Sequence, residues 1–209
     1  MRTLLFSGVM LMLVGCSPKV FKAKWTEEKA PEYFNARFET TKGNFDIEAR
    51  RDWSPAGVDR LYQLIKHGFY TDIAIFRVVP DYVVQFGIHN DSTITKVWRD
   101  RPIPDEPVIK KNEVGTISFA RGGPKTRTTQ IFVNLKSNSP RLDELDGGGV
   151  IGFPGIAQVT SGMDVVLTFY AGYEDGPSRK QGLIFSQGNA YLKEHYPELD
   201  YIKKAYLLK

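Results

Sequence analysis

The sequence has few of the residues that build metal, redox and disulfide centres. Its 209 residues include one cysteine, Cys16, and three histidines, His67, His89 and His195. A single thiol excludes an internal disulfide and every CxxC metal or redox motif. The histidines show neither HxxxH nor HExxH spacing, so the chain offers no recognisable zinc site. We therefore expect chemistry that uses no metal and no cofactor.

Signals for nucleotides and nucleic acids are also missing. The chain contains no GxxxxGK[ST] phosphate loop and no GxSxG nucleophile elbow. Lys and Arg exceed Asp and Glu by 28 − 24 = +4, and the positive charges are scattered rather than gathered in a stripe. This pattern predicts that nucleic acid is not a partner. The rest is an ordinary globular mixture, 42% apolar and 25% charged, long enough to bury a core without cross-links.

The first sixteen residues have the pattern of an export signal. Arg2 precedes an apolar run over 4–14 that is about half the length of a membrane-spanning helix. The run ends in Leu-Val-Gly-Cys, which resembles the bacterial lipobox, whose cysteine is acylated and becomes the first residue after cleavage. The alternative is a short core helix in which Cys16 is a passive buried side chain. We predict a lipoprotein signal peptide over 1–15 and attachment to the lipid bilayer through acylated Cys16.

These features predict a location and a domain organisation. The predicted location is the bacterial cell envelope, and Ser17 favours the periplasmic face of the outer membrane. Residues 16–33 are rich in Lys, Glu and Pro, which is typical of a tether; alternatively, Val20, Phe21 and Trp25 pack on the domain. The folded domain is expected over 34–185, followed by a docked tail over 186–209 that begins as a helix and continues extended. We expect a monomer.

Hydrophobic periodicity predicts many short strands and few helices. A hairpin is expected around 42–44. A helix is expected over 54–68, with Ser54 as its cap, Pro55 in its first turn and Gly68 at its end. A second helix is expected over 162–170. Further strands are predicted at 73–79, 82–86, 115–120, 130–135 and 156–159. This pattern is typical of a mainly β fold, a closed barrel capped by helices.

Two segments have the composition of a binding site. In the first, Phe76 to Gly87, an arginine stands at the start of a strand–turn–strand and a glutamine on the second strand. The second, Phe119 to Val133, is a Gly- and Thr-rich loop that leads into a strand. On that strand Gln130 and Phe132 are two residues apart and therefore share a face.

These motifs resemble those of the cyclophilin family of peptidyl-prolyl cis-trans isomerases. FRxxPxYxxQ and AxxGPxTxxxQxF occur in family order with the hairpin, the capped helix, RLD and GMDVV, over about residues 36–170. The resemblance implies a closed eight-stranded antiparallel β-barrel capped by two helices. It also implies proline-containing polypeptides as substrates and no cofactor.

The resemblance assigns a role to each site residue. Arg77 is the catalytic cation that hydrogen-bonds the prolyl nitrogen, and Gln85 orients Arg77 or the substrate carbonyl. The remaining residues are expected to bind substrate, Arg121 mainly through its backbone and Gln130 from the rim of the pocket; they are Tyr82, Val83, Ala120, Arg121, Gln130, Phe132, Leu142 and Phe153. Arginine suits the catalytic role because it is planar and always charged. This interpretation requires the Arg77 guanidinium to stand open beside Phe132 rather than buried in an ion pair.

Departures from the family pattern leave other functions open. Tyr82 and Val83 replace a common Phe and Met, and Arg141 stands where a Trp often lies, so cyclosporin binding is not expected. One alternative is a proline-peptide binding module with negligible turnover. Another is a scaffold lipoprotein that bridges membrane and cell wall.

Overall fold

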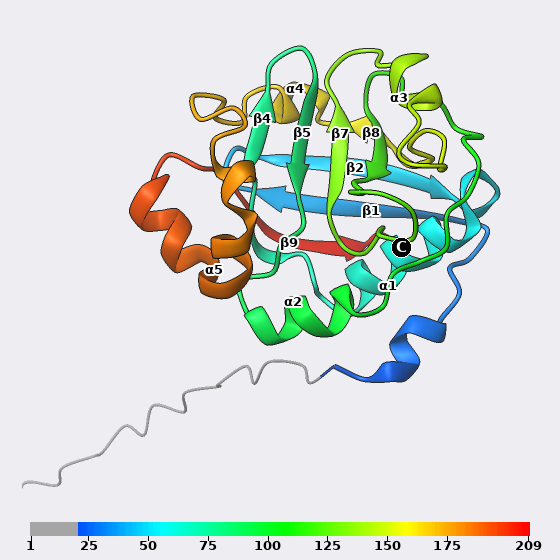
Figure 1. The fold of residues 1–209 in the computed structure, drawn as a ribbon, viewed down its shortest axis with the longest axis horizontal. Coiled ribbons are helices and arrows are strands. Elements are labelled where there is room, and N and C mark those ends of the chain that lie inside the picture. The colour runs from blue at the N-terminus through cyan, green and yellow to red at the C-terminus, as the bar shows by residue number, and fades with distance from the viewer. Residues whose placement is uncertain (1–20) are drawn as a thin grey trace, which may run out of the picture.

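The computed structural model describes residues 21–209, in which nine strands form one antiparallel sheet (Figure 1). The order across the sheet is β3-β9-β1-β2-β8-β6-β7-β5-β4. The strands are β1 (Tyr33–Thr40), β2 (Asn44–Arg50), β3 (Thr71–Ala74), β4 (Arg77–Val79), β5 (Val83–Phe86), β6 (Thr116–Phe119), β7 (Ile131–Asn134), β8 (Gly155–Ser161) and β9 (Tyr201–Leu207). The expected hairpin is confirmed, since β1 pairs with β2 in register from Tyr33↔Arg50 to Glu39↔Asn44.

The expectation of a closed eight-stranded barrel is wrong in two respects. The sheet has nine strands, and its two edge strands, β3 and β4, do not pair with each other. They are consecutive in the chain, separated only by Ile75 and Phe76, where the single strand expected over 73–79 is broken. The sheet curls so that β1, β2 and β9 cross behind β4, β5 and β7 (Figure 1), which gives an open half-barrel.

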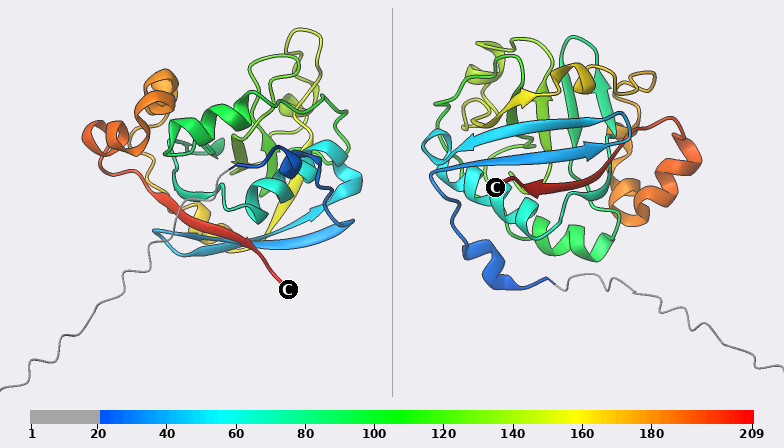
Figure 2. Two further views of the ribbon diagram at one scale, coloured as in Figure 1. Left: turned by 90° about the horizontal axis from the view of Figure 1, so that it is seen from below. Right: turned by 180° about the vertical axis from the view of Figure 1, so that it is seen from behind.

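Helices flank the curled sheet. The α-helices are α1 (Pro55–Lys66), α2 (Ser92–Arg99), α3 (Arg141–Glu144), α4 (Met163–Val166) and α5 (Gln181–His195), and the 3₁₀ helices are η1 (Ala23–Glu27), η2 (Arg51–Trp53) and η3 (Pro177–Lys180). The expectation of two capping helices is therefore wrong, since residues 21–209 contain five α-helices. The helix expected over 162–170 is a single turn, α4. Figure 2 shows α5 standing out at one side of the molecule. Within residues 21–209, every helix is too short or too polar to span a bilayer.

Two apolar cores hold these elements together. The larger lies between the curled sheet and α1 and includes Phe38 and Phe45, whose stacked rings are 4.9 Å apart. The smaller joins Phe76, next to β4, to Ile184 and Leu192 of α5. Burial of side chains of this size contributes about 1.5–3 kcal/mol each. The second core therefore fixes α5 against the edge of the sheet.

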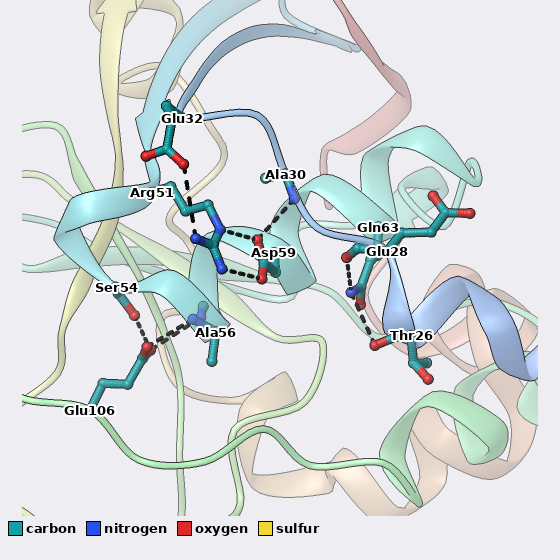
Figure 3. A network of polar contacts seen from close by, with 11 residues as sticks. Thr26, Glu28, Ala30, Glu32, Arg51, Ser54, Ala56, Asp59, Gln63 and Glu106 are labelled. Atoms are coloured by element: carbon teal, nitrogen blue, oxygen red, sulfur yellow. Dashed lines mark hydrogen bonds and ion pairs between the residues drawn. The ribbon is translucent and has the colours of Figure 1, made fainter.

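The first described residues pack on the domain rather than forming a tether. Gln63 of α1 donates its amide to the carbonyls of Thr26 and Glu28, at 3.2 and 2.7 Å (Figure 3). The Trp25 ring stacks on His67 at 4.0 Å. The tether expectation is thus wrong from residue 21 onward, and packing of Phe21 and Trp25, the alternative, is confirmed. The predictions for the signal peptide, Cys16, Ser17 and Val20 lie outside the described residues.

The C-terminal stretch differs from the expected docked tail. It does begin as a helix, but β9 lies between β3 and β1, inside the sheet. Its register runs from Ala36↔Leu207 to Thr40↔Ile202, and Ile202 is fully buried. Residues 201–207 are therefore part of the curled sheet. The alternation that would mark them as a strand is interrupted by Lys203 and Lys204, both exposed.

The start of α1 is capped by a distant carboxylate rather than by Ser54. The Ser54 hydroxyl donates to Glu106. Figure 3 shows Glu106 beside Ser54 and the backbone of Ala56. Glu106 also accepts from the backbone N–H groups of Ala56 and Gly57, at 2.8 and 3.1 Å, and from buried Arg127 at 3.0 Å. A negative charge is favourable at this end of a helix. Burial acts to raise the pKa of Glu106, but these hydrogen bonds outweigh it and hold the pKa below its usual value.

We expect Glu106→Gln to lower the free energy of unfolding by about 1–3 kcal/mol at pH 7, the cost of losing charge-assisted hydrogen bonds at a buried site. Because the folded-state pKa is lowered, the deficit should be complete above the ordinary glutamate pKa of 4.5 and shrink as the pH falls below it. Urea unfolding at pH 7 measures the loss of stability, and urea unfolding at pH 4 measures how far that loss has shrunk. Exposed Glu113→Gln is the control, and equal stability of the two variants would contradict this account.

Candidate active site

Strand register places the central site residues in one row across the sheet. Arg77 on β4 lies opposite Gln85 on β5, and Gln85 lies opposite Phe132 on β7. Directly paired residues of an antiparallel sheet point to the same face. Three residues separated by up to 55 positions in the sequence therefore stand side by side.

The row forms one side of a small cavity of about 150 Å³. Nine of the ten residues that we expected in the site line it; they are Arg77, Tyr82, Val83, Gln85, Ala120, Arg121, Phe132, Leu142 and Phe153. Val83, Phe132 and Leu142 form a separate buried apolar cluster at its base. The rings of Phe132 and Phe153 meet edge to face at 5.6 Å. The cavity thus combines an apolar floor with one cationic wall.

Arg77 is held by side chains without being buried. Its Nε donates to the Asp175 carboxylate at 2.5 Å, and its Nη1 donates to the Gln85 Oε1 at 3.2 Å. The Arg77 side chain remains 23% exposed. Its hydrogen bonds to other residues of 21–209 come from Nε and Nη1, so Nη2 donates none. The guanidinium lies 5.6 Å from the centre of the Tyr82 ring. An ion pair that we did not expect is therefore present, but the head group still faces the cavity that Phe132 lines.

The tenth expected residue, Gln130, does not line this cavity but lines a second one of about 210 Å³. The Gln85 amide donates to the Gln130 Oε1 at 2.8 Å, and the Gln130 amide donates to Gln181 at 2.9 Å. Arg121 lines both cavities. Its side chain donates to the carbonyls of Val150 and Gly152, each at 2.7 Å. A contact of Arg121 to substrate through its backbone stays a prediction. No motif in the sequence pointed to Asp175 or Gln181.

A buried amide supports the apolar wall of the cavity. Asn112 is fully buried and donates to Asp143 and to the Phe153 carbonyl, both at 2.8 Å. It also accepts from Ser118 at 3.0 Å and from Asn134 at 3.2 Å. Asn112 thereby ties the turn that carries Leu142 to β6 and β7. The sequence gave no signal for this role, because Asn112 lies in a polar stretch that reads as an ordinary loop.

The turn between β4 and β5 holds a non-glycine residue in a conformation that favours glycine. Asp81 has a φ of +53°, in the left-handed region. Glycine adopts this conformation without strain, and aspartate tolerates it better than most residues. Asp81 therefore fills a glycine position while the register of Arg77 and Gln85 is kept.

Within the described part of the chain, no group of three or more His, Cys, Asp or Glu side chains is arranged to hold a metal ion.

The fold is shared with solved structures. A cyclophilin type peptidyl-prolyl cis-trans isomerase from Cryptosporidium parvum superposes with a TM-score of 0.60 at 17% identity, over 85% of this chain and 98% of that one. A second structure of that protein, determined in the presence of the dipeptide Ala-Pro, gives a TM-score of 0.59 at 16% identity, over 84% and 99% of the two chains. At such identities the likeness establishes the cyclophilin fold.

Sequence comparison establishes the family. The model of the family described as "Cyclophilin type peptidyl-prolyl cis-trans isomerase/CLD" matches residues 35–185. The chain therefore belongs to the cyclophilin-type peptidyl-prolyl cis-trans isomerases, as its motifs predicted.

Curated relatives agree with this assignment. Peptidyl-prolyl cis-trans isomerase-like 1 of Rhizopus delemar is 30% identical over 61% of this chain and 74% of its own length. Peptidyl-prolyl cis-trans isomerase CYP65 of Arabidopsis thaliana is 32% identical over 56% of this chain, but the match spans only 20% of that relative. These relatives come from a fungus and a plant, so they give no support to the bacterial lipoprotein form that the first sixteen residues predict.

We expect Asn112→Ala to lower the free energy of unfolding by about 1–3 kcal/mol, because it removes the side-chain hydrogen bonds that Asn112 makes at a fully buried site. Phe153 loses its tie at the same time, so peptide binding should weaken as well. Urea unfolding measures the first effect and NMR titration with a short proline peptide the second. Stability within about 0.5 kcal/mol of wild type would contradict the supporting role.

Proposed function

We propose that this chain accelerates rotation about X–Pro peptide bonds in exported proteins, with Arg77 as the catalytic cation. The observation that carries the proposal is the row Arg77–Gln85–Phe132, which sets a guanidinium at the wall of an apolar cavity. Membership of the isomerase family supports the same conclusion.

The chemistry requires weakening of amide resonance. The barrier to rotation of a peptide bond is about 18–20 kcal/mol and arises from conjugation of the nitrogen lone pair with the carbonyl. In the twisted state this lone pair is localised on the prolyl nitrogen and accepts a hydrogen bond. The Nη2 of Arg77 is the donor available for it, since Nε and Nη1 are engaged by Asp175 and Gln85. A donor fixed beside charge that develops only in the transition state lowers the barrier.

The apolar residues of the cavity bind the proline ring. Val83, Phe132 and Leu142 offer a surface for the pyrrolidine ring. Gln85 holds Arg77 through its Oε1, and one N–H of its amide is bonded to Gln130. The Cryptosporidium relative was crystallised in the presence of Ala-Pro, which fits a ligand of this kind. We propose proline-containing polypeptides as the substrates of this chain.

We expect Arg77→Ala to lower kcat/KM for a proline peptide by about 10²-fold, the usual cost of removing one transition-state donor. A protease-coupled isomerisation assay on the full chain measures it. Arg37→Ala is the matched control, because Arg37 also pairs with an aspartate through its Nε but lies on the β1–β2 hairpin. Equal activity of wild type and Arg77→Ala would exclude the role of Arg77. Tight peptide binding without acceleration in wild type would instead indicate a binding module.

We further propose that Cys16 carries lipid and holds the domain at the periplasmic face of a bacterial outer membrane. The support is the N-terminal sequence: Arg2, the apolar run over 4–14 and the terminal Cys16. Only residues 17–20 separate Cys16 from Phe21, the start of the segment that packs on the domain. Five peptide steps reach at most about 18 Å, so an anchored chain would hold its α1–η1 side close to the bilayer.

We expect the full chain made in a bacterium to incorporate labelled fatty acid and to enter the detergent phase on phase separation. Cys16→Ser should lose both properties. It should keep isomerase activity, because the residues that line the two cavities lie between positions 77 and 181. Incorporation of label into Cys16→Ser, or none into wild type, would exclude the anchor.

A further inference from the structure

The catalytic side chains belong to a series of hydrogen bonds, called the circuit below, whose two ends lie on one segment of the chain. Asp175 accepts from Arg77 at 2.5 Å, and Arg77 donates to Gln85 at 3.2 Å. Gln85 donates to Gln130 at 2.8 Å, and Gln130 donates to Gln181 at 2.9 Å. Asp175 and Gln181 flank η3, so the circuit starts and finishes on a stretch of seven residues. Arg77 lies on β4, Gln85 lies on β5, and Gln130 directly precedes β7.

The direction of the circuit is set by the arginine. Arginine only donates hydrogen bonds, so Gln85 must turn its oxygen toward Arg77 and its NH₂ toward Gln130. Gln130 is oriented in the same sense and presents its NH₂ to the oxygen of Gln181. Gln181 therefore acts as the terminal acceptor. Flipping either amide would place two donors face to face and break the chain of bonds.

The segment that supplies both ends is anchored to the sheet beside Arg77. The Asp175 carbonyl accepts from the Ser178 hydroxyl at 2.8 Å and from the Arg179 N–H at 3.2 Å, which fixes the turn. Ile184, one turn into α5, packs in the same buried cluster as Phe76, the residue that precedes Arg77. Figure 1 shows the beginning of α5, in orange, next to β4. Movement of residues 175–181 would therefore shift Asp175 and Gln181 together.

We propose that Asp175 and Gln181 are positioning residues of the isomerase site, an inference that rests on the proposed function. Asp175 occupies Nε of Arg77 and so fixes the plane of the guanidinium with Nη2 toward the cavity. Gln181 completes the amide chain that holds Gln85 against Nη1. A donor oriented in advance loses no freedom when the transition state forms. The circuit thus prepares Arg77 for the prolyl nitrogen.

The ion pair between Arg77 and Asp175 is partly open to solvent, unlike a buried ion pair that holds a fold together. Asp175 is 39% exposed and Arg77 is 23% exposed. Ion pairs open to solvent contribute little to stability, since water and salt screen them. Removal of Asp175 should therefore change turnover while leaving folding nearly unchanged.

The first experiment compares kcat and KM of the full chain with those of Asp175→Ala and Asp175→Asn. We expect Asp175→Ala to lower kcat by about fivefold, the scale of one partly exposed charged contact, with KM unchanged within about twofold. Asp175→Asn retains an acceptor oxygen, so its kcat should lie between those of wild type and Asp175→Ala. Asp46→Ala, which removes the similar Arg37 pair at 2.7 Å, is the control and should match wild type.

The second experiment tests the other end of the circuit. Gln181→Glu keeps an acceptor for Gln130 and should retain kcat, whereas Gln181→Leu removes it and should lower kcat by about two- to threefold. NMR of the Arg77 Nε–Hε group gives a readout independent of turnover. The wild-type signal should be sharp and distinct from those of free arginine side chains, and in Asp175→Ala it should broaden and move toward them.

Three results would overturn the inference. Activity of Asp175→Ala within twofold of wild type would show that the contact is idle, and increased activity would show that Asp175 competes with substrate for Arg77. A change confined to KM would make Asp175 a substrate contact. Each differs from failure of the proposed function, in which Arg77→Ala would be as active as wild type or wild type would not accelerate isomerisation.

Discussion

The pairing of β5 with both β4 and β7 is the constraint on which the site depends. It aligns Arg77, Gln85 and Phe132 on one face, so that a cation and an aromatic ring meet with a glutamine between them. A slip of one residue in either pairing would turn one partner to the opposite face. The Asp81 turn keeps the β4–β5 register, and Asn112 holds the opposite wall in place. The chemistry proposed for Arg77 therefore depends on the strand register that places Gln85 and Phe132 beside it.

The C-terminal third of the chain serves this arrangement from outside the main core. The cluster that contains Phe76 and Ile184 fastens α5 to the edge of the sheet, where β4 has no further strand beside it. The segment before α5 then supplies Asp175 and Gln181. An open edge is usually a liability in a sheet, because its unpaired backbone groups invite another strand. Here a helical segment stands beside that edge and contacts the residues that carry the function.

Prediction from sequence worked where local pattern and spacing were sufficient. The hairpin, α1 and most of the short strands followed from alternation and helical periodicity, and the two motifs contain seven of the nine residues that line one cavity. It failed where a distant residue decided the outcome. Ser54 has the chemistry of a cap, but its hydroxyl pairs with Glu106, fifty-two positions away. The last strand was expected as a tail, because exposed Lys203 and Lys204 interrupt its alternation.

The sequence by itself determined the family and the mainly β composition, because motifs and alternation are local patterns along the chain. The resemblance of its motifs to a known family then identified the side chains that face the cavity. Tertiary structure alone decided that the sheet stays open with nine strands, that β9 lies inside it and that the N-terminal segment packs on α1. It alone brought Asp175 to Arg77 across 98 positions. Such contacts depend on how separate elements dock, and neither residue of a long-range pair carries a local signal for the other.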